Sequence, residues 1–251
     1  MIDLYIPRRA MTLFLLIDSS GSMAINGNMG KVNGAIEEMI PLLRDISDEQ
    51  SDAEIKLAVL EFSSGCSWAT GDNGPVSLDD FEWNDMVAGG LTDMGAAFRE
   101  LESKLSRNAF MNNAAGNYAP VIILLTDGEP TDDYISGLKV LQHNNWFRHA
   151  VKIAVSVENS SDDVLTEFTG SDETVLKYDG EKSDLKKLLT RLAVVSSTIQ
   201  SRSQGVEIPD SGDVNTIISE DPGTQTAKEI IQIVQEDDSA DAGDPVWDIE
   251  W

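Results

Sequence analysis

The chain has 251 residues, of which 44 are acidic and 18 are basic, so its formal net charge is -26. This length suits one α/β domain of about 200 residues with an extension, and the charge disfavours binding to nucleic acid or anionic membranes. The only cysteine is Cys66, which excludes an intrachain disulfide and a cysteine-rich zinc site.

The N-terminal segment from Met1 to Met11 contains no apolar stretch of signal-peptide length. No segment of the chain reaches the roughly 18 apolar residues that are needed to cross a bilayer. We therefore expect a cytoplasmic protein.

Short apolar segments alternate along the chain with longer amphipathic ones, which is typical of βαβ units. The apolar segments predict strands over 13–17, 55–62, 121–126, 151–157 and, more weakly, 174–178. The amphipathic segments predict helices over 30–46, 94–105, 133–143, 162–168 and 183–197. The predicted fold is therefore α/β: a doubly wound, Rossmann-like, mostly parallel sheet with helices on both faces. Residues 63–74, rich in glycine and serine, are expected to form a mobile loop.

Composition changes near residue 200, and we expect a domain over 1–200 followed by an acidic tail over 201–251. The tail holds thirteen acidic residues against two basic ones. The spacing of Ala227, Ile230, Ile231 and Val234 predicts a short amphipathic helix, although a strand over 230–234 is an alternative.

The chain ends in "DPVWDIEW", where Trp247, Ile249 and Trp251 alternate with Asp248 and Glu250. This alternation suits an added strand with one apolar face. We expect a docking segment for a partner, and folding back of this segment onto its own domain is the alternative.

Oxygen-bearing side chains gather where two predicted strands end. Asp18, Ser20 and Ser22 follow the first strand, Asp127 follows strand 121–126, and Thr92 precedes helix 94–105. Because ligands of parallel sheets bind at the carboxyl ends of the strands, these side chains are candidates for one site. Five oxygen ligands suit a hard cation such as Mg²⁺, with Mn²⁺ or Ca²⁺ as alternatives.

Simpler explanations exist for each acid on its own. Asp18 alone could be a turn or capping residue. Asp132 and Asp133 precede a predicted helix, where acids complement the helix dipole. Asp93 either caps helix 94–105 or adds charge near the cation.

The segment "DSSGS", together with Thr92 and Asp127, resembles the metal-ion-dependent adhesion site (MIDAS) of von Willebrand factor A (VWA) domains, written D-x-S-x-S, T and D. The resemblance extends over about residues 10–200. It implies that Ser20 and Ser22 bind the metal directly, that Asp18 and Asp127 reach it directly or through water, and that Thr92 joins or leaves the inner shell.

Within that superfamily, "LLIDSSGSM", "LTDMGAAFRELESKL" and "LLTDGEPTDDY" resemble the TerY-like proteins of bacterial tellurite-resistance loci. The resemblance implies a non-enzymatic, metal-dependent adaptor whose partner presents a carboxylate to the ion. The partners implied are a serine/threonine kinase and a PP2C-type phosphatase in stress or defence signalling. A VWA subunit coupled to a chelatase-type motor ATPase is the alternative.

Two enzyme classes fit the sequence poorly. A haloacid-dehalogenase-like phosphatase needs a second acid two residues after Asp18, where this chain has Ser20. A serine hydrolase needs a base, and "DSSGS" lacks the G-x-S-x-G spacing, while His143 and His149 lie on or just after a predicted helix distant in sequence from these loops. We therefore expect no catalytic residues.

Overall fold

The computed structural model describes residues 8–79, 81–157, 162–178, 184–203, 208 and 221–240. The strands are β1 (Arg9–Asp18), β2 (Ala53–Ser63), β3 (Gly65–Trp68), β4 (Val76–Ser77), β5 (Val121–Thr126), β6 (Val151–Val157) and β7 (Val175–Tyr178). The helices are α1 (Asn28–Glu49), α2 (Met94–Lys104), α3 (Tyr134–Gln142), α4 (Asn145–His149), α5 (Asp162–Thr169), α6 (Leu185–Arg202) and α7 (Pro222–Ala240), with 3-10 turns η1 (Gly21–Gly27) and η2 (Asp172–Thr174). The predicted segment 245–251 lies outside the described residues.

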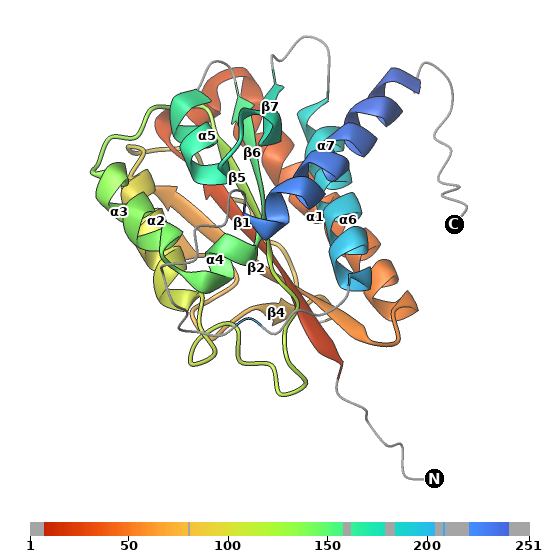
Figure 1. The fold of residues 1–251 in the computed structure, drawn as a ribbon. Coiled ribbons are helices and arrows are strands. Elements are labelled where there is room, and N and C mark those ends of the chain that lie inside the picture. The colour runs from red at the N-terminus through yellow and green to blue at the C-terminus, as the bar shows by residue number, and fades with distance from the viewer. Residues whose placement is uncertain are drawn as a thin grey trace.

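The strands form one sheet in the order β3-β2-β1-β5-β6-β7, with β4 also paired to β2 (Figure 1). Strands β1, β2, β5, β6 and β7 pair in parallel, while β3 and β4 run antiparallel to β2. The predicted α/β class and mostly parallel sheet are confirmed. The prediction of a loop over 63–74 is wrong for 65–68, because this segment adds the edge strand β3.

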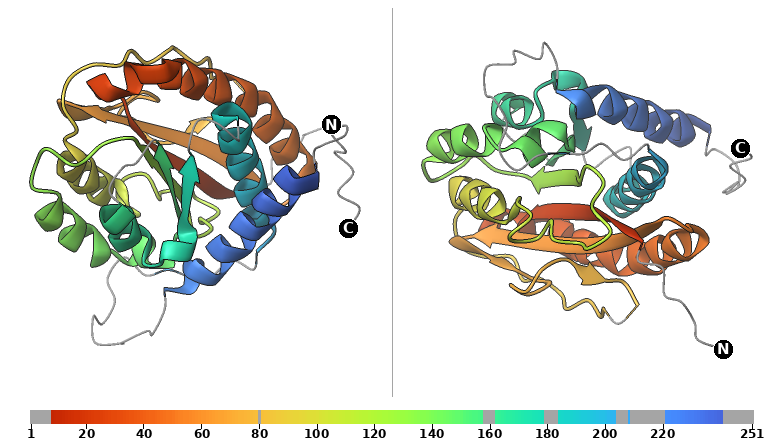
Figure 2. Two further views of the ribbon diagram at one scale, coloured as in Figure 1. Left: turned by 90° about the horizontal axis from the view of Figure 1, so that it is seen from above. Right: turned by 60° about the horizontal axis from the view of Figure 1, so that its bottom comes forward.

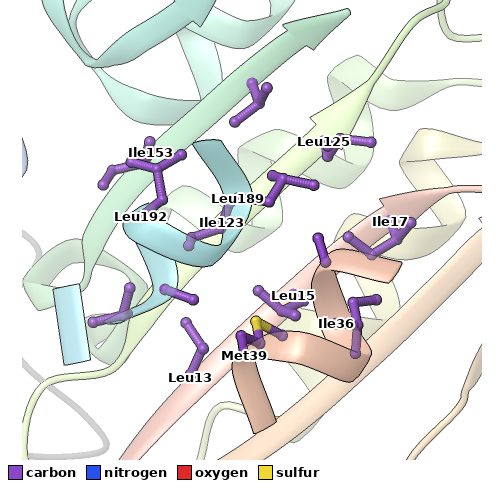
Figure 3. Close-up of a cluster of buried hydrophobic side chains, with 14 of the residues drawn as sticks. Leu13, Leu15, Ile17, Ile36, Met39, Ile123, Leu125, Ile153, Leu189 and Leu192 are labelled. Atoms are coloured by element: carbon purple, nitrogen blue, oxygen red, sulfur yellow. The ribbon is translucent and has the colours of Figure 1, made fainter. Parts of the chain in front are cut away.

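Helices cover both faces of the sheet (Figure 2). Alternate residues of β1 point to opposite faces of the sheet. Leu13, Leu15 and Ile17 pack in a cluster with α1 and α6 (Figure 3). Phe14 and Leu16 pack in a second cluster with α2 and α5. Burial on both faces explains why the central strands read as almost continuous apolar segments. Among the described residues, no helix has the length and apolarity needed to cross a bilayer.

Helix α7 belongs to the predicted acidic tail, and it packs on the sheet beside α6 (Figure 1). The four residues whose spacing predicted a helix, Ala227, Ile230, Ile231 and Val234, are all buried in the α1 and α6 cluster. Residues 230–234 are therefore helical, and the strand alternative is wrong. The helix is also longer than its apolar spacing indicated.

The start of α7 is fixed by a close approach and an ion pair. A Cβ on Gly223 would lie 1.9 Å from the carbonyl oxygen of Ala150, so only glycine fits there. Lys152, almost fully buried on β6, pairs with the carboxylate of Asp221 and lies 4.7 Å from the ring centroid of Phe147. Burial lowers the pKa of the Lys152 ammonium, and the Asp221 charge partly offsets this effect.

We predict that Gly223→Ala destabilises the protein by about 1–3 kcal/mol, because the new methyl group forces α7 away from β6. Urea unfolding measures this change. Gly30→Ala is the matched control, since a Cβ on Gly30 of α1 meets nothing within 4 Å. Removing a helical glycine there should stabilise by about 0.5–1 kcal/mol. Equal effects of the two substitutions would contradict the close approach of α7.

Candidate metal centre

The carboxylate of Asp18 lies at the carboxyl end of β1 and is fully buried. The register of β1 on β5 pairs Ile17 with Leu125, which places Asp18 beside Thr126. The hydroxyl of Thr126 donates to Asp18 Oδ2 at 2.5 Å, and the backbone N–H of Ser20 donates to Oδ1 at 2.8 Å. Asp18 is therefore held by hydrogen bonds from its own turn and from the neighbouring strand.

Two serines connect this end of β1 to the end of β5. The hydroxyl oxygens of Ser20 and Ser22 lie 3.0 Å apart. Ser22 Oγ donates to Asp127 Oδ1 at 2.6 Å. Ser20 is buried, whereas Ser22 and Asp127 are half-buried, so the group reaches from the interior to the surface.

Gly128 lies close to Thr92 and to the side chains of this group. An ideal Cβ on Gly128 would lie 3.4 Å from Thr92 Oγ1, 3.8 Å from Ser22 Oγ and 3.9 Å from Asp18 Oδ2. Oxygen atoms from two separate chain segments, residues 18–22 and Thr92, thus lie within 4 Å of the side-chain position that glycine leaves empty. The structure brings together Asp18, Ser20, Ser22, Thr92 and Asp127, all five residues that the sequence predicted for one site.

Electrostatics at this group favour a cation. Burial raises the pKa of the Asp18 carboxyl above its usual range, and the nearby Asp127 carboxylate raises it further, while the hydrogen bonds from Thr126 and Ser20 oppose the shift. Two carboxylates and three hydroxyls supply oxygen ligands of the kind that Mg²⁺, Mn²⁺ or Ca²⁺ accepts. The residues present therefore fit a hard divalent ion.

The hydroxyls are essential to this fit. Within the described ranges, no group of three or more His, Cys, Asp or Glu side chains is placed to hold a metal ion. Both histidines have other contacts: Nδ1 of His143 lies 2.6 Å from the carbonyl of Lys139, and Nδ1 of His149 lies 2.8 Å from that of Asn145.

Three further residues position the site, and sequence reasoning did not assign them this role. Thr126 holds Asp18, as described above. Thr131 Oγ1 accepts from the N–H of Thr92 at 3.0 Å, and the N–H of Thr131 donates to the Thr92 carbonyl at 2.9 Å. Asp132 accepts from the N–H groups of Gly95 and Ala96 at 2.7 and 2.8 Å, so it caps α2.

Asp133 and Asp93 were both predicted near the start of a helix, but only Asp133 caps the helix that follows it. Asp133 caps its own helix α3 by accepting from the N–H of Ser136 at 3.1 Å, as a local reading expects. Asp93 stands at the start of α2 but does not cap it. Its carboxylate accepts from the N–H of Gly65 at 2.8 Å and from Thr131 Oγ1 at 3.2 Å, and so ties β3 to the loop after β5.

A family model for the von Willebrand factor type A domain matches residues 12–191. Comparison with curated protein sequences gives no match. Helix α7 lies beyond the matched residues.

Several solved structures are similar to this chain. Proximal thread matrix protein 1 from the mussel byssus aligns with a TM-score of 0.55 at 19% identity, over 75% of this chain and 49% of that protein. Another structure of that protein, described as having a zinc-occupied MIDAS motif, aligns with the same TM-score at 20% identity, over the same shares of the two chains. The ArnB paralog VWA2 from Sulfolobus acidocaldarius aligns with a TM-score of 0.53 at 17% identity, over 74% of this chain and 46% of that one. This chain thus spans about half the length of these proteins, and the likeness is one of fold.

We predict that Thr126→Val destabilises the protein by about 1–3 kcal/mol, because it removes a donor from the buried Asp18 carboxylate. Thr12→Val is the matched control on β1, since Thr12 Oγ1 is buried and has no hydrogen-bond partner in the part of the chain that the structure describes. That change should be neutral or stabilising by urea unfolding. A loss at Thr12 as large as that at Thr126 would refute the supporting role of Thr126.

Proposed function

This chain belongs to the von Willebrand factor type A domain family, whose domains commonly serve as metal-dependent protein interaction modules, and we propose that it is such a module. The observation that carries the proposal is the convergence of five oxygen-bearing side chains at the carboxyl ends of β1 and β5. We assign Asp18, Ser20, Ser22, Thr92 and Asp127 as the residues that hold the ion, with Mg²⁺ as the preferred cation.

The donor set explains why such a site would attract an acidic partner. Only Asp18 and Asp127 bring negative charge, and the three hydroxyls are neutral. When bound, the divalent ion would supply a positive centre for a carboxylate of the partner. We propose that these residues bind and orient the ion and take part in no bond cleavage, so that the role is a non-enzymatic one.

The finer assignment rests on the resemblance to TerY-like proteins. We propose an adaptor in a bacterial kinase and phosphatase system for stress or defence, acting in the cytoplasm, with a serine/threonine kinase and a PP2C-type phosphatase as partners. We also keep the division into a VWA domain over 1–200 and an acidic tail over 201–251 as a proposal. The support for assignment to this subfamily is the resemblance of three sequence segments around the site to TerY-like proteins: 15–23, 91–105 and 124–134.

We predict that MgCl₂ or MnCl₂ raises the melting temperature of the protein. An ion at 100 times its dissociation constant adds about 2.7 kcal/mol to the stability of the folded state. The Asp18→Ala, Asp127→Ala double variant should lose this increment. Asp133→Ala is the control, because it removes a nearby carboxylate that only caps α3. An equal ion-dependent shift in the wild type and the double variant would refute the site.

We also predict that removing the ion releases the partner without unfolding the domain, because the core strands are held by their own apolar burial. The tagged protein is captured from its native host with MgCl₂ and then washed with EDTA. Far-UV circular dichroism should stay unchanged while the partner elutes. Elution of a kinase or phosphatase supports the TerY-like assignment, an ATPase supports the motor alternative, and full retention in EDTA contradicts both.

A further inference from the structure

Exposed apolar side chains flank the candidate metal centre. Within the described part of the chain, five large hydrophobic residues are exposed: Ile25, Val87, Leu91, Ile135 and Val140. Three of them, Ile25 at 57%, Val87 at 82% and Leu91 at 57% exposure, lie on η1 and on the segment that leads to Thr92. We call Ile25, Val87 and Leu91 the apolar rim.

The backbone that carries the apolar rim is held firmly. Asn33 both donates to the carbonyl of Met86 at 2.9 Å and accepts from its N–H at 3.0 Å. The N–H of Gly89 donates to the carbonyl of Ser19 at 2.7 Å, and the carbonyl of Gly90 accepts from the N–H of Gly21 at 3.2 Å. These bonds hold the segment that carries Val87 and Leu91 against residues 19–21, which adjoin Ser20 and Ser22, so the backbone of the rim is fixed next to the candidate metal centre.

An occupant of this face must combine two chemical properties. A carboxylate would meet the ion, and large apolar side chains next to it would cover the rim, as tryptophan commonly does at interfaces. The chain itself ends in such a segment, "VWDIEW", in which Asp248 and Glu250 alternate with Trp247, Ile249 and Trp251. Building on the proposed metal site, we propose that the C-terminal segment 245–251 of a second copy of this chain docks on that face.

The position of α7 favours exchange between copies over binding within one chain. The left view of Figure 2 places the C-terminal end of α7 and the red segment before α1, which contains η1, at opposite edges of the domain as seen from above. Asp248 follows Ala240 by eight residues, a tether of about 28 Å at full extension. Mutual exchange needs no crossing of the domain, and it closes as a two-fold dimer in which each copy completes the other's site.

Sedimentation velocity tests the exchange at 0.15 M NaCl, where salt screens the repulsion between two acidic chains. In MgCl₂ the full chain should sediment as a dimer. It should become a monomer in EDTA and also after deletion of residues 245–251. A Val87→Ser, Leu91→Ser variant should dimerise about tenfold more weakly, and Val140→Ser, which changes an exposed valine on α3, should behave as the wild type.

A labelled peptide with the sequence of residues 241–251 gives the direct measurement. It should bind the chain that lacks residues 245–251 in MgCl₂ and not in EDTA, and Asp248→Asn with Glu250→Gln in the peptide should abolish binding. The exchange is overturned if the full chain stays monomeric in MgCl₂. It is also overturned if the peptide binds with the same affinity to chains with and without the Val87→Ser, Leu91→Ser substitutions. If Mg²⁺ still raises the melting temperature in those samples, the proposed exchange is rejected and the proposed metal site is kept. If Mg²⁺ has no effect, the metal site fails with it.

Discussion

The buried carboxylate of Asp18 is the constraint on which the arrangement of the site depends. Pairing of β1 with β5 sets Asp18 beside Thr126 and brings Asp127 to the same end of the sheet. Two acids in this position destabilise one another, and burial makes a charge on Asp18 costly. Hydrogen bonds from Thr126 and Ser20 offset part of that cost. A bound divalent cation would offset the rest, which connects the stability of this end of the sheet to the proposed function.

The surrounding loops show how a surface site is kept in one geometry. Thr131 fixes the backbone of Thr92, Asp93 ties the same loop to β3, and Asp132 caps α2 from the loop after β5. Each of these contacts joins segments that lie far apart in the sequence. Positions held in this way lose little conformational freedom on binding, which favours affinity for a partner. The firm backbone and the exposed rim next to it together suit recognition by docking of a rigid surface.

Helix α7 extends the domain beyond the residues that match the family model. Its apolar face completes the cluster that α1 and α6 form over the sheet, while Gly223 and the pairing of Lys152 with Asp221 fix where it begins. The acidic region therefore contributes to the core through one helix. In the proposed exchange, the same helix sets the point from which the C-terminal segment leaves the domain.

Local sequence was sufficient for the fold class. It also proposed Asp18 and Asp127 as candidate residues, because apolar segments that end at these acids can be recognised without any partner strand. Strands 121–126 and 151–157 were predicted with the observed bounds. Periodicity could not supply the relations between distant segments. Thr126 supports Asp18 only through the β1–β5 register, Asp132 caps α2 and not its own helix, and residues 65–68 become a strand only because the edge of β2 is open to them. These features depend on which backbones approach one another, and side-chain packing across the whole domain decides that.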